Sequence, residues 1–262
     1  MSRWARLEGV VDVEGLARRH VLVAGLGSGG STVALELSKA GVGRFTLIDP
    51  ERLEPANVIR HECDDRYLGW PKVEAVADLI RRRNPKAEVE VIADVLERCG
   101  PLPGADLVAG CTDTEPPKRR LNRLCLEAGV PAVYAGVYER GVGGEVIRCG
   151  AKLEDSCYAC VTSVLKEPVA VPTAGEEPDY GVAEPQSFPA LGLDLRLVAL
   201  IHAKVCLLTL LGEELPGNVV LFGTAAVEEL FPRPLASALV TVARQESCLV
   251  CGHRSREERS VR

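Results

Sequence analysis

The stretch HVLVA-GLGSGG-STVALELSKA-GVGR-FTLID, residues 20–49, decides the fold. Its apolar run at 21–24 contains β-branched residues and is typical of a buried parallel strand. Apolar residues at helical spacing predict a helix over 31–40, and a second strand is expected over 45–49. Strand, glycine loop, helix and strand in this order indicate a nucleotide-binding α/β unit.

The glycine loop carries the chemistry of this unit. Gly25, Gly27 and Gly30 have the spacing G-x-G-x-x-G. Glycine at these positions allows a tight turn and lets the backbone approach phosphate oxygens at a helix N-terminus. Asp49 follows about twenty residues later, where a ribose-binding carboxylate is expected. The alternative is a loop that only turns the chain; the order of the elements favours nucleotide binding.

Composition narrows the class of protein. The chain has 262 residues, of which 47% are apolar and 26% charged, as in an ordinary soluble globular protein. A net charge of −6 does not indicate a nucleic-acid partner. No signal peptide is apparent, and the apolar stretch 191–211 contains Asp194, Arg196 and Lys204. We therefore expect a core helix there, no membrane partner and a cytoplasmic location.

Alternating strands and helices continue beyond residue 49 and predict a parallel, doubly wound sheet over residues 1–135. The first twenty residues are amphipathic and are expected to pack beside the first strand or against a partner subunit. The further elements expected in this half are a loop with short turns over 50–70, helices over 72–83 and 118–128, and strands over 88–93, 106–109 and 130–135.

The pattern changes in the second half, residues 136–252. Turn signals within 134–149 predict an antiparallel meander, and strands are expected over 218–223 and 239–245. The fold class predicted is therefore α/β: a mostly parallel, Rossmann-like sheet extended by an antiparallel C-terminal part, in a single domain. The last ten residues, 253–262, are charged and expected to be disordered.

Two C-x₂-C pairs in the second half predict a metal site. Four thiolates in two such pairs suit tetrahedral zinc, and they leave no open position for water, so the zinc would be structural. Two unrelated pairs of buried thiols are the alternative, and a redox pair is disfavoured because neither pair follows a strand of a βαβ unit. The predicted ligands are Cys157, Cys160, Cys248 and Cys251.

Polar residues after the nucleotide unit predict phosphoryl or nucleotidyl transfer. Asn57 and Arg60 lie in the 50–70 loop, Lys72 opens a helix, and Asp113 follows a strand whose carboxyl end faces the glycine loop. Transfer of a nucleotidyl group requires cations on the phosphates and a carboxylate for Mg²⁺. Hydride transfer requires no such set, so an NAD-dependent oxidoreductase is disfavoured.

These motifs together resemble the E1-like activating enzymes, the ThiF/MoeB/HesA family that includes the adenylation domains of ubiquitin-activating enzymes. The resemblance runs from about residue 16 to residue 252. It is carried by GLGSGG at 25–30, LID at 47–49, NVIRH at 57–61, GWPK at 69–72, DLV at 106–108 with CTD at 111–113, RLN at 120–122 and the paired cysteines.

The resemblance implies a reaction and a role for each residue. The reaction is adenylation of the C-terminal glycine carboxylate of a ubiquitin-fold or sulfur-carrier protein that ends in Gly-Gly, with ATP as donor and pyrophosphate released. Asp49 would bind the ribose, Asn57 and Arg60 the phosphates, Lys72 the charge that develops on the triphosphate, and Asp113 the Mg²⁺. The catalytic set is thus Arg60, Lys72 and Asp113, and the backbone of Gly25, Gly27, Ser28, Gly29 and Gly30 lines the nucleotide.

The resemblance also implies partners: a second copy of the chain in a homodimer, and a sulfur donor or an E2-like acceptor that takes the activated carboxylate. Arg3 or Arg6 would be the arginine that reaches the neighbouring subunit's site, or this arginine would be missing, since the N-terminus is shorter than in the family.

The sequence departs from the family in two respects. Ser28 replaces a glycine, and the proline-rich segment 166–189, which corresponds to the family's crossover loop, contains no cysteine. The second departure disfavours a thioester step, for which Cys63 or Cys206 would be the candidates. A non-catalytic nucleotide-binding scaffold is a further alternative. Thiamine, molybdopterin, another thio-cofactor and protein conjugation all remain open as pathways.

Overall fold

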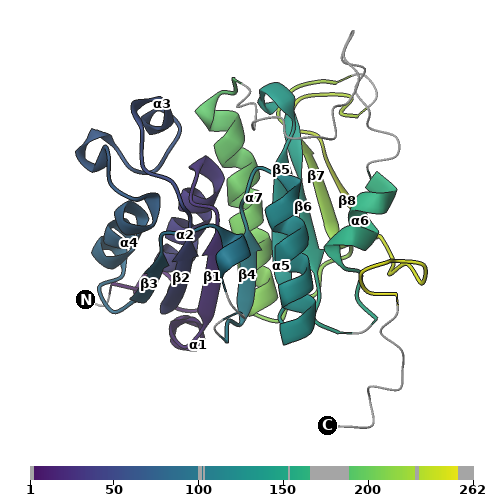
Figure 1. Ribbon diagram of the computed structural model, residues 1–262, viewed down its shortest axis with the longest axis horizontal. Helices are drawn as coiled ribbons and strands as arrows, with labels where there is room; N and C mark the ends of the chain where they lie inside the picture. The colour runs from purple at the N-terminus through teal and green to yellow at the C-terminus, as the bar shows by residue number, and fades with distance from the viewer. Residues whose placement is uncertain are drawn as a thin grey trace.

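A mixed eight-stranded sheet forms the centre of the molecule in a computed structural model, with the strand order β3-β2-β1-β4-β5-β6-β7-β8 (Figure 1). The structure describes residues 3–99, 102, 104–152, 154–165, 189–227 and 230–252. The strands are β1 His20–Ala24, β2 Arg44–Ile48, β3 Glu88–Ile92, β4 Leu107–Gly110, β5 Ala132–Val137, β6 Gly143–Cys149, β7 Val219–Gly223 and β8 Ser237–Val240.

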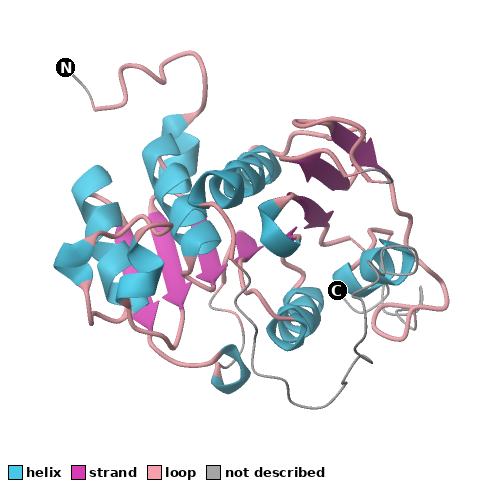
Figure 2. Ribbon diagram, turned by 90° about the horizontal axis from the view of Figure 1, so that it is seen from above, coloured by secondary structure: helices cyan, strands magenta, loops and turns pink. Residues whose placement is uncertain are grey.

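The helices cover both faces of this sheet. They are α1 Val13–Ala17, α2 Ser28–Ala40, α3 Pro55–Val58, α4 Lys72–Arg83, α5 Glu115–Ala128, α6 Tyr158–Leu165 and α7 Gly192–Leu210, with short 3₁₀ turns η1 Asp65–Tyr67, η2 Leu96–Arg98 and η3 Glu139–Gly141. One apolar core joins α2, α4 and α7 to the sheet, and a second core joins α5 and α6 to its other face (Figure 2).

The parallel half has the topology that the sequence predicts. Strands β3, β2, β1, β4 and β5 pair in parallel, and β5 to β8 pair in antiparallel fashion. The strand order reverses between β1 and β4, where Ala24 pairs with both Ile48 and Gly110. Ligands bind at such reversal points, outside the carboxyl ends of the strands. The predicted fold class, a Rossmann-like sheet with an antiparallel extension, is confirmed.

The glycine loop leads directly into α2. Gly27 is the N-cap of this helix, which begins at Ser28, three residues before the predicted start at residue 31. Gly41 ends the helix with φ of 112°, a left-handed conformation that favours glycine. The helix is thus bounded by glycines at both ends, and its first turn belongs to the predicted nucleotide loop.

The C-terminal half differs from the prediction in two elements. The strand expected over 239–245 is observed as Ser237–Val240, because β8 ends opposite Val219, the first residue of its partner strand β7. Beyond this point the Asn218 side chain binds the backbone N–H and C=O of Val242. The helix α6 was not predicted, and it begins inside the first cysteine pair. It follows the antiparallel strand β6, so the pair still does not belong to a βαβ unit.

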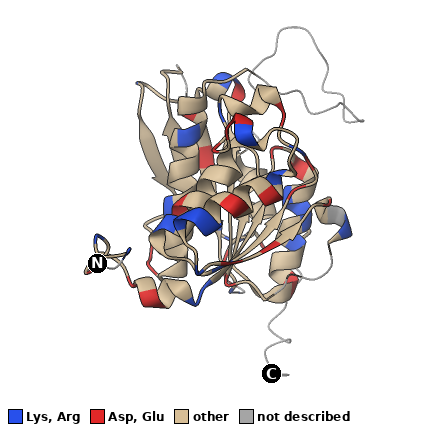
Figure 3. Cartoon of the chain, turned by 90° about the vertical axis from the view of Figure 1, so that its left-hand side faces the viewer, with Lys and Arg blue, Asp and Glu red and all other residues tan. Residues whose placement is uncertain are grey.

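Several predictions concern parts of the chain outside the described residues, namely the proline-rich segment up to residue 188 and the tail 253–262. Among the residues that the structure describes, no helix is both long and apolar enough to cross a membrane. Acidic and basic positions are interspersed on the side of the molecule seen in Figure 3. This mixture agrees with the modest net charge of −6.

Candidate active site

The glycine loop packs against the carboxyl end of β4. Gly25 has φ of +88°, and a Cβ on it would lie 2.8 Å from the carbonyl of Cys111. A Cβ on Gly30 would lie 1.8 Å from the Gly25 oxygen, so both positions require glycine. Gly27 and Gly29 instead face open space, with no atom within 4 Å of a built Cβ. The loop therefore touches the sheet on one side and leaves room for a ligand on the other.

Asp49 holds this loop from the end of β2. Its Oδ2 accepts a hydrogen bond from the Leu26 N–H at 2.6 Å, and its Oδ1 accepts one from the Glu51 N–H at 2.8 Å. Burial raises the pKa of the Asp49 carboxyl, while these two backbone donors act in the opposite direction. Each carboxylate oxygen has a second lone pair, so the predicted ribose-binding residue keeps acceptor capacity for two hydroxyls.

Lys72 lies at the start of α4, beside the same loop. It is only 4% exposed, and its ammonium is paired with the carboxylate of Glu51, whose side chain is largely in solvent. Burial is the main cause of the raised pKa of Asp49 and of the lowered pKa of His61, and the positive charge of Lys72 acts to lower both. Lys72 therefore lies within electrostatic range of Asp49 and of His61. The structure thus brings Lys72 and Asp49 together as predicted, and it adds Glu51, which the sequence analysis did not single out.

Asn57 and Arg60 lie on and just after the short helix α3. The Asn57 side chain accepts a hydrogen bond from the Glu54 N–H at 3.0 Å, so in this structure it caps α3. Arg60 is half-buried and packs against the start of α7, where a Cβ on Gly192 would lie 3.2 Å from the Arg60 Cβ. Both residues therefore lie on a turn between the glycine loop and α7.

Two neighbours of Arg60 attach this turn to the nucleotide unit. His61 Nε2 lies 2.7 Å from the Leu26 carbonyl oxygen. Glu62 Oε1 lies 2.9 Å from Thr32 Oγ1 on α2 and 2.8 Å from an Arg196 nitrogen on α7. Sequence reasoning assigned no role to His61 or Glu62, although their position directly after Arg60 was the available signal.

Asp113 lies beyond the carboxyl end of β4, on the other side of the glycine loop from Asp49. It follows Cys111 and Thr112, whose backbone contacts Gly25, and its side chain is exposed. The hydroxyl of Thr112 is buried and has no hydrogen-bond partner among the described residues. A buried polar atom without a partner is costly, and a ligand in the crevice would satisfy it.

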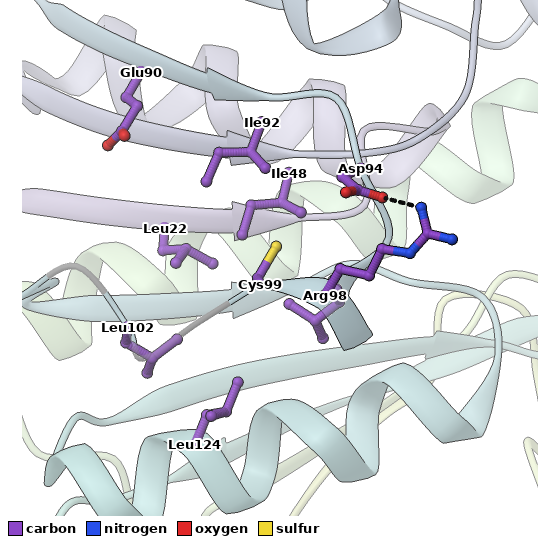
Figure 4. A pocket seen from close by; sticks show the side chains of 10 residues that line it. Leu22, Ile48, Glu90, Ile92, Asp94, Arg98, Cys99, Leu102 and Leu124 are labelled. Atoms are coloured by element: carbon purple, nitrogen blue, oxygen red, sulfur yellow. Dashed lines mark hydrogen bonds and ion pairs between the residues drawn. The ribbon is translucent and has the colours of Figure 1, made fainter.

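A cavity of about 370 Å³ lies on the α5 side of the sheet, under β1, β2 and β3 (Figure 4). No helix lies within the described part of the β3–β4 connection, which contains the short turn η2. Leu22, Ile48 and Ile92 line the cavity from the strands, and Asp94 and Arg98 form an ion pair of 3.4 Å at the carboxyl end. The cavity lining combines apolar side chains with the charged groups of Glu90, Asp94 and Arg98, and it does not include Asp49, Lys72 or the glycine loop.

The two cysteines considered for a thioester are both buried. Burial raises the pKa of Cys63 to about 12 and that of Cys206 well above its usual value. A nucleophilic cysteine requires the thiolate form and access for its substrate. Cys111 is similar: burial raises its pKa to about 12, and its sulfur lies 3.8 Å from His202 Nδ1.

The four predicted metal ligands do come together, at the far end of the molecule. Their sulfurs all lie within 4.8 Å of one another, with separations of 3.8 Å for Cys157–Cys160, 3.8 Å for Cys157–Cys248 and 3.4 Å for Cys160–Cys251. A tetrahedron with Zn–S bonds of about 2.3 Å has sulfur–sulfur edges of about 3.8 Å. The donor set therefore fits zinc in both chemistry and size.

Backbone groups prepare this cluster for a metal. Burial acts to raise the pKa of Cys248, but the N–H groups of Cys251 and Val250 lower it to about 7. The Gln245 N–H points at the Cys160 sulfur at 3.4 Å. Gly252 has no room for a side chain, because a Cβ would lie 2.3 Å from the Glu246 oxygen. The N–H contacts favour the thiolate, which is the metal-binding form, whereas burial raises the pKa of Cys157 and of Cys251.

Of the two candidates for the cross-subunit arginine, Arg3 is used within the chain. Its guanidinium donates hydrogen bonds to the carbonyls of Arg82 and Arg83, at the C-terminal end of α4. That end of α4 is the opposite end from Lys72, so this contact does not place Arg3 in its own subunit's crevice.

The fold and the site define a Rossmann-like α/β protein with a crevice beside the glycine loop, Asp49 and Lys72 and with a separate four-cysteine cluster. The ThiF family model matches residues 2–234, and the chain belongs to this family.

The chain is similar to the "Molybdopterin-synthase adenylyltransferase" of Salmonella typhimurium, with 30% identity over 59% of this chain and 63% of that protein. It is also similar to the "SAMP-activating enzyme E1" of Haloferax volcanii, with 28% identity over 64% of this chain and 62% of that protein. Both matches cover less than two thirds of the relative's own length.

Among solved structures, that of E. coli MccB with MccA-N7isoASN has a TM-score of 0.74. It is 20% identical and covers 96% of this chain and 75% of the other. At that identity the likeness establishes the fold, which is the one predicted.

Proposed function

We propose that this protein is an ATP-dependent adenylyltransferase that activates the C-terminal glycine carboxylate of a ubiquitin-like or sulfur-carrier protein. The observation that carries the proposal is the position of Lys72. A 4% exposed ammonium beside the glycine loop and Asp49 provides a fixed cation for a triphosphate. A hydride-transferring site has no need of it, so this reading is favoured over an NAD-dependent oxidoreductase.

The crevice suits ATP as its ligand. The open space beside Gly27 and Gly29 admits phosphates against backbone N–H groups at the start of α2. The unpartnered hydroxyl of Thr112 and the remaining lone pairs of Asp49 offer polar contacts. Asn57 and Arg60 would bind phosphate oxygens, and Asp113, exposed at the same edge, would hold Mg²⁺, which neutralises charge on the triphosphate.

The proposed reaction follows from these groups. An oxygen of the glycine carboxylate attacks the α-phosphorus of ATP, the bond between the α-phosphorus and the bridging oxygen breaks, and pyrophosphate leaves. Both reactants are anionic, so Arg60 and Lys72 offset their repulsion and the charge that develops on the leaving pyrophosphate. The product is an acyl-adenylate, which a sulfur donor or an E2-like acceptor then takes up.

A thioester on this chain is not favoured as the next step, because Cys63 and Cys206 are buried and their pKa values are raised. Zinc at the four-cysteine cluster would hold residues 248–251 against the start of α6 and leave no ligand position for catalysis. As in the family it resembles, we propose that the protein acts as a homodimer in the cytoplasm.

The test is ATP–pyrophosphate exchange with several small ubiquitin-fold proteins that end in Gly-Gly. We expect exchange that depends on the partner and on Mg²⁺, and that is lost in Asp113→Ala. Mass spectrometry of the partner's C-terminus would identify an adenylate, a thiocarboxylate or an isopeptide. Absence of partner-dependent exchange with all of these proteins, or full activity in Asp113→Ala, would contradict the proposal. Nucleotide binding without any exchange would favour a non-catalytic scaffold.

A further inference from the structure

Both backbone polar groups of Leu26, the residue between Gly25 and Gly27, form hydrogen bonds to side chains. Its N–H donates to Asp49 Oδ2 at 2.6 Å, and its carbonyl oxygen lies 2.7 Å from His61 Nε2. The side chain of Leu26 is fully buried. The loop that faces the nucleotide is therefore fixed through one residue, from β2 on one side and from the Arg60 turn on the other.

The second nitrogen of His61 determines which form of the ring makes this contact. His61 Nδ1 lies 3.0 Å from the Cys63 backbone nitrogen, whose N–H can only donate. Nδ1 must then be unprotonated and accept this bond. In a neutral imidazole the proton consequently resides on Nε2, which donates to the Leu26 carbonyl.

A protonated ring would break this arrangement. Imidazolium has a proton on both nitrogens, so Nδ1–H would point at the Cys63 N–H, and two donors would face each other. Burial lowers the pKa of His61, the Leu26 carbonyl and Glu62 act in the opposite direction, and Lys72 adds to the lowering. Asp49 and the His61 ring bind different backbone groups of Leu26, its N–H and its carbonyl, respectively.

The His61 bond also links the two predicted phosphate-binding elements. His61 directly follows Arg60, and Glu62 anchors the same turn to Thr32 on α2 and to Arg196 on α7. The glycine loop is thus attached to the Arg60 turn through the bond between His61 and Leu26. Without it, the loop and the Arg60 turn would lose this direct connection, while Glu62 would still hold the turn to the helices.

We propose that His61, as the neutral Nε2–H tautomer, is a positioning residue that keeps the glycine loop and Arg60 in one geometry for the nucleotide. This inference rests on the proposed function. It implies that nucleotide affinity depends on the protonation state of a side chain that does not itself touch the nucleotide.

The experiment measures the dissociation constant of Mg·ATP for the full-length wild-type protein and two variants, by calorimetry between about pH 8 and about pH 5. His61→Gln retains an N–H donor for Leu26 and an oxygen acceptor for Cys63, but it cannot be protonated in this range. His61→Ala removes both bonds. His20→Gln is the control for general effects of acid. His20 is a buried histidine at the amino end of β1, the opposite end of the strand from the glycine loop.

At the upper pH, we expect His61→Gln to bind within a few-fold of wild type and His61→Ala to bind about tenfold more weakly, which corresponds to the loss of about one hydrogen bond. On acidification, the affinity of wild type should fall relative to that of His61→Gln. The ratio cancels the protonation of ATP itself, and the control should follow wild type. Thermal unfolding without nucleotide shows whether each variant is folded.

Two results would overturn the inference while leaving the proposed function intact: a ratio of wild type to His61→Gln that stays constant with pH, or wild-type affinity in a folded His61→Ala. A relative affinity that rises in acid would also overturn it, since attraction between imidazolium and phosphate would then dominate. Failure of the wild-type protein to bind Mg·ATP at any pH would overturn the proposed function and this inference together.

Discussion

The two halves of the molecule are stabilised in different ways. In the parallel half, β1 is buried along its whole length, and apolar residues of α2 and α4 join the strands in one continuous core. In the C-terminal half, β8 is largely exposed, and the chain after Val240 has no regular structure before the four-cysteine cluster. Apolar burial therefore supports the crevice, whereas we expect the C-terminal segment to depend on bonds between its thiolates and a metal.

Metal removal should have the largest effect on stability, and this effect should be confined to the C-terminal half. Structural zinc sites contribute on the order of 10 kcal/mol of binding free energy. We expect a chelator, or Cys160→Ser, to release residues 241–252 and to lower the melting temperature strongly. Metal analysis combined with hydrogen exchange checks this. Protection of β1 and β2 should persist, and loss of protection throughout the sheet would show that the halves are not separable.

The core of the parallel half is tested by a matched pair of truncations. Leu47 on β2 is 0% exposed, and Leu239 on β8 is 50% exposed. Leu47→Ala should lower the free energy of unfolding by about 2–5 kcal/mol, because it leaves a cavity among buried side chains. Leu239→Ala should change it by about 0.5 kcal/mol or less. Chemical denaturation measures both, and equal losses would contradict the comparison.

The crevice is tested by Lys72→Met, which keeps much of the side-chain volume and removes the charge. We expect the rate of pyrophosphate exchange to fall by about 10²–10³-fold, as for the loss of other groups that stabilise developing charge. Stability should change little, because Glu51, the partner left behind, is mostly in solvent. A folded variant with the wild-type rate would mean that Lys72 does not stabilise the transition state.

The same contrast explains what the sequence could and could not predict. Glycine spacing, helix period and buried aliphatic runs are local signals, so α4 was predicted at its observed bounds and β1 and β2 to within one residue. The four cysteines were predicted from their pairing, although 87 residues separate the two pairs, because metal-ligand spacing is also a local signal.

The missed features depend on contacts between distant segments. The end of β8 at Val240 is set by where its partner β7 begins, and α6 packs against α5 from within a cysteine pair. Glu51, His61 and Glu62 acquire their partners only when β2, α2 and α7 meet at one edge. No sequence period or motif specifies these contacts between distant segments. The bonds that position the Arg60 turn could therefore be identified only from the structure.

The last test concerns His202, which lies where the two halves meet. It belongs to α7, its Nε2–H donates to the Val133 carbonyl on β5 at 3.0 Å, and its Nδ1 faces the Cys111 thiol at the end of β4. Burial lowers its pKa to about 4, with Lys118 adding to the lowering and the Val133 carbonyl opposing it. The folded protein therefore keeps this ring neutral at pH values where the unfolded chain protonates it.

The sign of the pH effect follows from that difference. At pH values above the unfolded pKa of about 6.5, neither state binds the proton and the full stability is present. Between about pH 6.5 and about pH 4 the unfolded state binds more protons than the folded state. The free energy of unfolding therefore decreases by roughly 3 kcal/mol as the pH is lowered through this window.

His202→Gln retains a donor for Val133 and cannot be protonated, so the difference between its stability and that of wild type isolates this residue from His20, His61 and the thiolates. We expect the difference to develop across that pH window in the unfolding of both halves. If only the signal from the C-terminal half changed with pH, α7 would belong to that half alone, and the crevice would be stable without it.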